Sequence, residues 1–380
     1  MLKPYKHINP IKRIFFMISK LKIITSNMIN HRFLLFGMIA LTVLIGCQPA
    51  DPGTEADGAA PMVDRNELMS DITYLASDQL EGRRTDTEGN ARARDFILKR
   101  YARVGLEPVN GTYEHPFEHV NPRTDERFEG AVNLLGVIPG TGVDMGGKDS
   151  SGSGSVGDGD GNGDMNNDGG DDYSDGDNRY IAVMAHYDHL GVREGEIYNG
   201  ADDNASGVGG LLALARYFSE HPPRHHLLFM ALDAEEQGLG GAVYYTENPA
   251  IPLDRFDMVL NMDMISNNDK NELYAVGTYH YPFLKPILEQ GTADAKVNVL
   301  FGYDSDAWPQ DWTMASDHGP FHGKGVPFVY FGVEDHAHYH QPSDIVENIN
   351  PDFYVNATEA IIQALIVLDE QVPVRSEKTQ

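Results

Sequence analysis

The chain has 380 residues, 41% of them hydrophobic, so it can bury the core of one large domain or two small ones. Its 57 acidic residues outnumber its 29 basic residues and give a net charge of -28. Because binding to nucleic acid or to an anionic membrane patch needs clustered lysine and arginine, this charge argues against both kinds of partner. The single cysteine excludes an internal disulfide.

Residues 1–46 are predicted to be a signal peptide, with Met28 as an alternative translation start. Residues 33–46 are uniformly apolar, which is the length of a signal-peptide core and short for a membrane span. They run into Leu-Ile-Gly-Cys, which resembles the bacterial lipoprotein box and implies an acylated Cys47. We therefore expect an exported lipoprotein of the cell envelope, anchored in the bilayer through Cys47. By resemblance to sorting patterns, Gln48 in place of aspartate favours the outer membrane.

Composition divides the rest of the chain into three parts. Residues 47–61 carry the anchor cysteine and then Pro, Gly, Ala and acidic residues, which predict a flexible tether. Residues 62–371 are predicted to form the folded domain, and 372–380 a short tail.

An Asp/Gly-rich insertion interrupts this domain at residues 141–178, where ten aspartates accompany one lysine. Such a composition predicts a disordered surface insertion between two strands. A calcium site is the alternative, because Asp158, Asp160 and Asn162 match the first half of an EF-hand loop. The twelfth position of that loop is Gly169, however, where the bidentate glutamate is needed.

The pattern of apolar residues predicts the elements in chain order. Helical spacing predicts helices at 65–77 and 91–105, the second ending at Gly105. Beyond the insertion, runs of apolar, β-branched and aromatic residues predict strands at 180–186, 226–234, 258–265, 272–277 and 326–333, alternating with helices at 207–220 and 354–370. Strands that are apolar on both faces predict an α/β fold, with a single domain built on a mixed, mostly parallel β-sheet and helices on both faces.

Polar side chains follow these strands, at the edge where α/β sheets bind ligands. They are His186, Asp188, the pair Asp202 and Asp203, the pair Glu235 and Glu236, Asp263 and His340. Imidazoles and carboxylates without thiolates are the ligand set of a site for two zinc-like ions. Divalent cations would also relieve the repulsion among so many buried carboxylates.

The segments "AHYDHLG", "GADDNASG", "AEEQG", "NMDM" and "YHQPSD" resemble, in this order, the zinc aminopeptidases of the M28 type. The resemblance covers residues 62–370 and implies a zinc-exopeptidase-like fold. It also implies that one Zn²⁺ ion is bound by His186 and Asp263, a second by Glu236 and His340, and that Asp202 bridges the two. A cis peptide is implied in the turn that contains Asp203.

Two further carboxylates receive catalytic roles. By resemblance, Glu235 is the general base that takes a proton from water and returns it to the leaving amine. Asp188 lies two residues after His186, so both side chains lie on one side of an extended segment. We expect Asp188 to accept the imidazole N–H and orient the ring.

Other residues near the motifs receive lesser roles. His189, His318, His336 and His338 are expected to support the site or to be solvated. Some relatives place an oxyanion-donating tyrosine where Thr313 stands, so the resemblance does not identify the oxyanion donor of this chain. Two functions remain open for Trp308 and Trp312, which either line a substrate pocket or cap the core.

The predicted function is an aminopeptidase that removes N-terminal residues from peptides with a free N-terminus, and no specific protein partner is inferred. The alternatives are a glutaminyl cyclase, which typically uses one zinc ion, and a non-catalytic binding scaffold. A carboxypeptidase would need basic residues for a C-terminal carboxylate, and Arg83, Arg84 and Lys324 are the candidates.

Overall fold

The computed structural model describes residues 61–142 and 179–373. The predicted signal peptide, the Cys47 anchor and all but the last residue of the tether lie outside the described residues, as do most of the Asp/Gly-rich insertion and residues 374–380. In the described ranges, no helix is both long and apolar enough to cross a bilayer.

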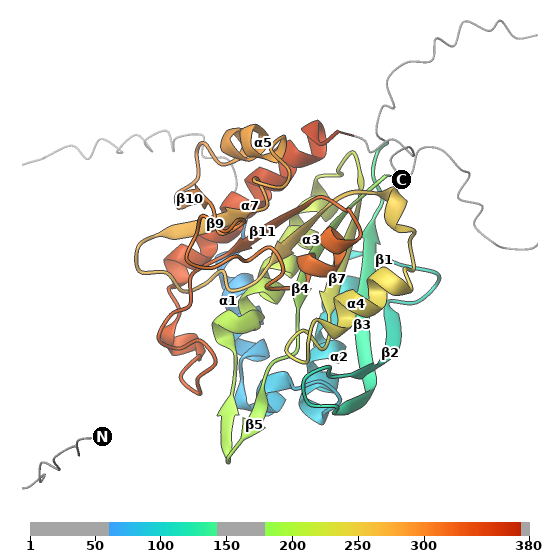
Figure 1. Cartoon of the computed structure of the whole chain (residues 1–380), viewed down its shortest axis with the longest axis vertical. Helices are drawn as coiled ribbons and strands as arrows, with labels where there is room; N and C mark the ends of the chain where they lie inside the picture. The colour runs from blue at the N-terminus through green and yellow to red at the C-terminus, as the bar shows by residue number, and fades with distance from the viewer. Residues whose placement is uncertain (1–60, 143–178, 374–380) are drawn as a thin grey trace, which may run out of the picture. The chain divides into compact units, whose positions relative to one another are not determined.

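A nine-stranded mixed sheet forms the centre of the described residues. Its strands, in spatial order, are β1 (Glu107–Pro108), β3 (Arg127–Ile138), β7 (His226–Leu232), β4 (Tyr180–His186), β8 (Phe256–Met262), β11 (Phe328–Gly332), β9 (Glu272–Val276) and β10 (Asn298–Phe301), with β2 (Glu114–Val120) paired to β3 (Figure 1). The central strands β7, β4, β8 and β11 are parallel to one another, whereas the flanking strand β3 is antiparallel to β7 and the flanking strand β9 is antiparallel to β11. The predicted α/β fold is therefore confirmed.

Helices cover both faces of this sheet. One face packs against α1 (Arg65–Leu75), α2 (Glu88–Val104), α3 (Gly207–Glu220), α5 (Leu284–Gly291) and α7 (Pro351–Gln371), and the other against α4 (Gly240–Glu247) and α6 (His318–Gly323). Every residue of β4 is buried, because Val183 and its alternate neighbours face the first group of helices and Met184 faces the second.

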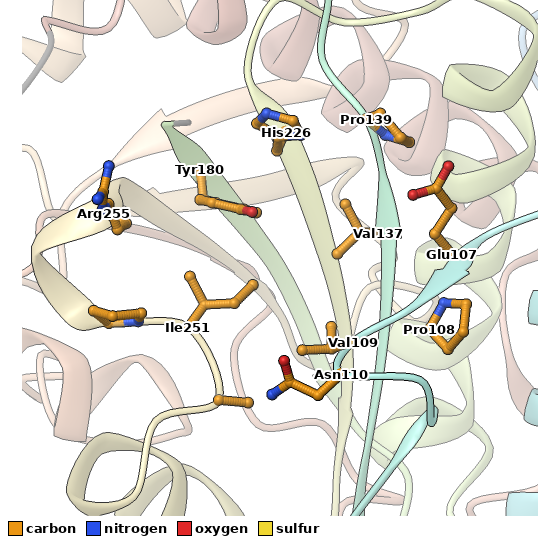
Figure 2. Close-up of a pocket in the computed structure, with 12 residues that line it drawn as sticks. Glu107, Pro108, Val109, Asn110, Val137, Pro139, Tyr180, His226, Ile251 and Arg255 are labelled. Carbon is orange, nitrogen blue, oxygen red and sulfur yellow. The ribbon is translucent and has the colours of Figure 1, made fainter. Parts of the chain in front are cut away.

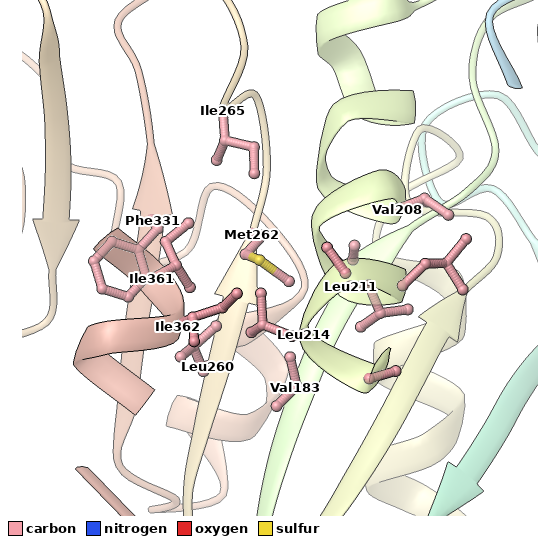
Figure 3. Packing of buried hydrophobic residues seen from close by; sticks show 14 of the residues in the cluster. Val183, Val208, Leu211, Leu214, Leu260, Met262, Ile265, Phe331, Ile361 and Ile362 are labelled. Carbon is pink, nitrogen blue, oxygen red and sulfur yellow. The ribbon is translucent and has the colours of Figure 1, made fainter. Parts of the chain in front are cut away.

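The larger core lies between the sheet and helices α3 and α7. Val183 and Leu260 of the sheet meet Leu211 and Leu214 of α3 and Ile361 of α7 (Figure 3). All five side chains are fully buried, and each such burial stabilises the fold by about 1.5–3 kcal/mol.

Local signals account for the ends of two predicted helices, although α2 begins at Glu88, three residues before its predicted start. Helix α2 begins after Thr87, whose side chain accepts the N–H of Asn90, and it ends at Gly105 in the left-handed conformation (φ 78°). Helix α3 has the predicted bounds. The residues of these ends therefore carry enough local information to place them.

The edge of the sheet formed by β1, β2 and β3 was not predicted. Strand β2 alternates exposed residues with partly or fully buried ones and includes Pro116, so it lacks the continuous apolar pattern of the central strands. A small antiparallel hairpin, β5 (Gly191–Arg193) with β6 (Glu196–Tyr198), was also missed. Both hairpins matter below, because their loops flank the candidate site.

Candidate metal centre

The parallel strands end at one edge of the sheet and bring the predicted residues there. His186 is the last residue of β4, and Asp263 directly follows β8. Glu235 and Glu236 lie in the turn between β7 and α4. Because adjacent parallel strands present their carboxyl ends together, residues distant in sequence meet in one cluster.

Asp203 lies at the centre of this cluster. Its Oδ1 atom is 3.4 Å from Nε2 of His186, and its Oδ2 atom is 3.0 Å from Nε2 of His340. The same nitrogen of His186 is 3.3 Å from Oδ1 of Asp263, and that of His340 is 3.4 Å from Oε1 of Glu236. One carboxylate is thus shared by two groups of donor atoms.

The geometry contradicts the prediction that Asp202 is the bridging residue. The Oδ1 atom of Asp202 accepts the backbone N–H and the hydroxyl of Ser266, both at 2.7 Å. Its Oδ2 atom lies 2.9 Å from Nε2 of His336. Asp344 accepts the backbone N–H groups of Asp202 and Asp203 at 2.9 and 3.1 Å. This clamp turns the first aspartate away from the cluster and the second into it.

The turn η2 (Ala201–Ser206) that carries these aspartates depends on close backbone approach. The peptide between Asp203 and Asn204 is cis, in the turn where the family resemblance implied such a bond. Gly200 has φ 56°, and a Cβ atom there would lie 2.0 Å from the carbonyl oxygen of Asp203 and 2.5 Å from the ring of His189. Only glycine therefore fits at position 200, where the backbone enters the turn that carries Asp203.

His189 lies in the cluster, although a supporting or solvated position was expected for it. It is fully buried, with Nδ1 2.7 Å from Oε1 of Glu236 and 3.7 Å from Oδ2 of Asp203. Among the described residues, two groups are able to hold a metal ion: His186 with Asp203 and Asp263, and His189 with Asp203 and Glu236. Its place three residues after His186 did not by itself distinguish His189 from the other histidines near the motifs.

The remaining residues near the motifs pack around the site. His318 is buried and bonded to the carbonyl of Trp312 at 2.8 Å, and burial lowers its pKa to about 4. His338 bonds to the hydroxyl of Ser343 at 2.9 Å. Trp312 both packs in the core and lines the cavity described below, which answers the question left open for it.

Asp188 holds the glutamate turn. Its Oδ1 and Oδ2 atoms accept the backbone N–H groups of Glu235 and Glu236 at 3.0 and 3.3 Å. Nδ1 of His186 is 3.7 Å from the Asp188 carboxylate and 3.2 Å from its backbone oxygen. The Asp188 carboxylate thus lies beside the imidazole that it is predicted to orient, and it also fixes the position of both glutamates.

Arg83 supports the loops from behind the cluster. Its buried guanidinium donates to the backbone carbonyl groups of Tyr187, Asn199 and Gly200 at 2.9, 2.6 and 3.0 Å. Burial lowers its pKa to about 10. The guanidinium of Arg83 therefore binds backbone carbonyl groups and is not available to bind the C-terminal carboxylate of a substrate.

The two adjacent glutamates differ in their affinity for protons. Burial raises the pKa of Glu235 well above its usual range. The nearby His186 acts to lower this pKa, and the carboxylate of Asp263 acts to raise it further. Burial also acts to raise the pKa of Glu236, but His189 and His340 hold it at about 2. One carboxyl group is thus suited to accept a proton and the other to remain an anionic ligand.

The donor set fits divalent cations. Asp203, Glu235, Glu236 and Asp263 are close together, and in the part of the chain that the structure describes no lysine or arginine forms an ion pair with them. Oε1 of Glu236 and Nδ1 of His189, although 2.7 Å apart, are not aligned for a hydrogen bond, and within the same described ranges neither they nor Nε2 of His189 has another hydrogen-bond partner. Buried charges without such partners are strongly destabilising, and nitrogen and oxygen donors of this kind suit zinc.

A cavity of about 510 Å³ opens over this cluster. Its acidic floor contains Asp203, Glu235, Glu236 and Asp263, and its apolar wall includes Met264, Trp312, Met314, Tyr330 and Tyr339. A cationic amine suits the floor, and an apolar side chain suits the wall.

A second cavity, of about 280 Å³, lies at the other end of the sheet. Tyr180 and His226, the first residues of β4 and β7, line it together with Val109, Val137 and Ile251 (Figure 2). Neither of the two candidate metal groups contributes to it. The chemistry therefore concentrates at the carboxyl edge.

Known proteins resemble this chain in sequence and in fold. Aminopeptidase YwaD of Bacillus subtilis is 30% identical over 194 residues, which cover 49% of this chain and 40% of that protein. The Porphyromonas gingivalis glutaminyl cyclase has a TM-score of 0.60 at 16% identity, over 80% of this chain and 99% of that one. A Zn-dependent exopeptidase from Parabacteroides distasonis has a TM-score of 0.56 at 16% identity, over 81% and 99%.

The two structural likenesses show the zinc-exopeptidase-like fold, as the sequence resemblance implied. The chain spans less than half the length of the Bacillus relative. The sequence profile of Peptidase family M28 matches residues 170–365, just over half of the chain. The chain therefore belongs to Peptidase family M28.

Proposed function

We propose that this protein is an aminopeptidase that uses two zinc ions to hydrolyse peptides with a free N-terminus. One observation carries the proposal: the Asp203 carboxylate presents one oxygen to His186 and the other to His340, each of which adjoins a further carboxylate. Such sharing is the arrangement that a pair of metal ions needs.

The proposed ligands are His186, Asp203 and Asp263 for one zinc ion, and Asp203, Glu236 and His340 for the other, with His189 beside the second group. Zinc bound there would polarise a carbonyl oxygen and acidify water, chemistry that side chains alone perform poorly.

Glu235 is the proposed general base. Its carboxylate lines the cavity and is not paired with any lysine or arginine of the described residues, and Asp188 holds its backbone N–H at 3.0 Å. A carboxylate so placed can take a proton from water and hand it to the leaving amine. The buried walls of Trp312 and Tyr330 exclude bulk water from the same cavity.

A glutaminyl cyclase remains the second candidate, because solved cyclases share the fold. Since that activity typically needs one zinc ion, the His186 and Asp263 pair, 3.3 Å apart, favours the peptidase. A non-catalytic scaffold is disfavoured by the complete donor set. We further propose, from the segment ending at Cys47, that the mature protein is an exported lipoprotein of the cell envelope.

A panel of aminoacyl chromogenic amides and an N-terminal glutaminyl peptide would test the function, with and without a zinc chelator. We expect chelator-sensitive hydrolysis and two equivalents of zinc. One equivalent of zinc together with a cyclised glutaminyl product would favour the cyclase over the peptidase. A protein that binds no zinc and turns over no substrate would be a non-catalytic scaffold. The intact mass of the mature protein tests the lipoprotein proposal, since it must begin at an acylated Cys47.

A further inference from the structure

A hollow adjoins the candidate metal centre on the side of Glu236 and His340. It measures about 530 Å³ and shares these two residues and Arg123 with the active-site cavity. Arg84 and Arg193 also line it. We call this hollow the arginine pocket. Arg123 comes from the loop between β2 and β3, and Arg193 from the hairpin of β5 and β6.

The positive charge of the arginine pocket is only partly neutralised. Arg84 pairs with Glu126 at 2.6 Å, and Glu126 lines the pocket as well. Arg123 and Arg193 are exposed and have no ion pair in the part of the chain that the structure describes, and the Arg193 guanidinium lies 5.6 Å from the Tyr198 ring centre.

Most arginines in the described part of this acidic protein form ion pairs. Arg100, Arg127 and Arg216, for example, each pair with a carboxylate. Two arginines without carboxylate partners, facing a hollow beside an acidic cluster, therefore form an anion-binding feature. A guanidinium binds a carboxylate through paired hydrogen bonds, so this is the matching ligand group.

The two hollows give a bound peptide a direction. Trp312 and Tyr330, which are 8% and 6% exposed, belong to the apolar wall of the active-site cavity, so the apolar side chain of the first peptide residue packs there and its amine lies over the acidic floor. The chain beyond the scissile bond must leave on the open side. Glu236 and His340 lie between the two hollows, so a peptide crossing them reaches the arginine pocket with its second residue.

We propose that the arginine pocket binds a carboxylate on the leaving side of the scissile bond. The carboxylate is either the C-terminus of a dipeptide or an acidic side chain of the second residue. This inference rests on the proposed aminopeptidase function, and it makes short or acidic peptides the preferred substrates.

Two matched peptide pairs distinguish the sources of the carboxylate. Leucylalanine against leucylalaninamide tests the C-terminus, and leucylglutamate amide against leucylglutamine amide tests the side chain. We expect kcat/KM to be about tenfold higher for the charged member of at least one pair, as charged hydrogen bonds of this kind imply. Arg123→Gln together with Arg193→Gln should reduce that ratio to about one.

Arg127→Gln is the matched control, because Arg127 is on the neighbouring strand β3, pairs with Glu118 and does not line the pocket. It should leave the ratio unchanged. Equal kcat/KM values within both pairs, or a ratio that survives the double substitution, would overturn the inference while leaving the peptidase intact.

A binding measurement keeps the two proposals separate. Calorimetric titration of the Glu235→Gln protein with the same four peptides should show tighter binding of the charged member of a pair. This difference in affinity should disappear when Arg123→Gln and Arg193→Gln are added to Glu235→Gln, which gives the triple variant. If no peptide is hydrolysed by the unsubstituted protein, the aminopeptidase proposal fails, and this titration still decides the arginine pocket. Equal affinities within both pairs would refute it.

Discussion

Oδ2 of Asp203 lies 3.0 Å from Nε2 of His340, whereas the carboxylate of Asp202, the preceding residue, is bonded to Ser266 and His336. Two adjacent residues with identical side chains therefore have different tasks. Asp203 belongs to the candidate metal centre, and Asp202 fastens the loop after β8 to the turn that carries them both.

This division predicts opposite outcomes for two matched substitutions. Asp203→Asn should lose at least one equivalent of zinc, because it removes the anionic group shared by both halves. Asp202→Asn should retain both equivalents and lower the melting temperature instead, since a buried acceptor of two hydrogen bonds is weakened. Elemental analysis with thermal melting makes the comparison, and loss of zinc only from the Asp202 variant would restore the original assignment.

Glu235→Gln should retain zinc and lose turnover. General bases of this kind contribute about 10²- to 10⁴-fold in rate, so we expect kcat to fall within this range while zinc content is unchanged. Glu247→Gln, at the exposed end of α4, is the control and should keep full activity. Stopped-flow or chromogenic assays suffice, and a Glu235 variant with near-normal kcat is incompatible with the proposed role.

His189→Gln should weaken the second metal site. The ring nitrogen 2.7 Å from Glu236 either binds zinc or orients its ligand, and changes to such groups typically cost about 10- to 100-fold in metal affinity. Competition with a zinc chelator measures the affinity of each site. His338→Gln, whose ring bonds to Ser343, is the control with unchanged affinity. Identical zinc affinities in the two variants would show that His189 only packs beside the site and neither binds zinc nor orients a ligand.

Gly200→Ala should destabilise the protein far more than Gly111→Ala. Both glycines have positive φ, 56° and 80°, so both substitutions add backbone strain of about 1 kcal/mol. Only at Gly200 would the new methyl group overlap a carbonyl oxygen, that of Asp203, whereas at Gly111 it meets open space. Urea unfolding should therefore separate the variants by at least about 2 kcal/mol, given the cost of overpacking. Equal losses would contradict the close approach.

His225 should make stability fall with rising pH. Burial acts to lower its pKa, but Asp257 and Asp369 raise the pKa above its ordinary value, and Arg179 also pairs with Asp257. A raised folded-state pKa stabilises the folded state below the unfolded value of about 6.5, and this contribution is lost as pH rises through the folded pKa.

The measurement is urea unfolding from pH 6 to pH 9 for the unsubstituted protein and for His225→Gln. The stability difference between the two proteins should be largest at pH 6 and should shrink at higher pH. His221→Gln, on the exposed end of α3, should track the unsubstituted protein throughout. A stability difference that stays constant or grows with pH would contradict the stabilising interaction of protonated His225 with Asp257 and Asp369.

Much of the fold was predictable because its signals are local. The apolar run of β4 and the small-residue start of α3 placed both elements at the bounds that the structure has. Strand β2 was missed, because its stability comes from pairing with β3 and it shows no continuous apolar run. Likewise, His189 lacked a distinguishing local signal, since its proximity to Glu236 depends on how two loops fold together.

By itself, the sequence determined the α/β class, the polar edge of the sheet and the residue types of the candidate site, since alternation, burial and donor chemistry can be recognised along a chain. Only the tertiary structure decided which aspartate of the adjacent pair enters the cluster. The physical reason is that Asp344 and Ser266, far along the chain, bind the backbone and side chain of this turn and so set the direction of each carboxylate.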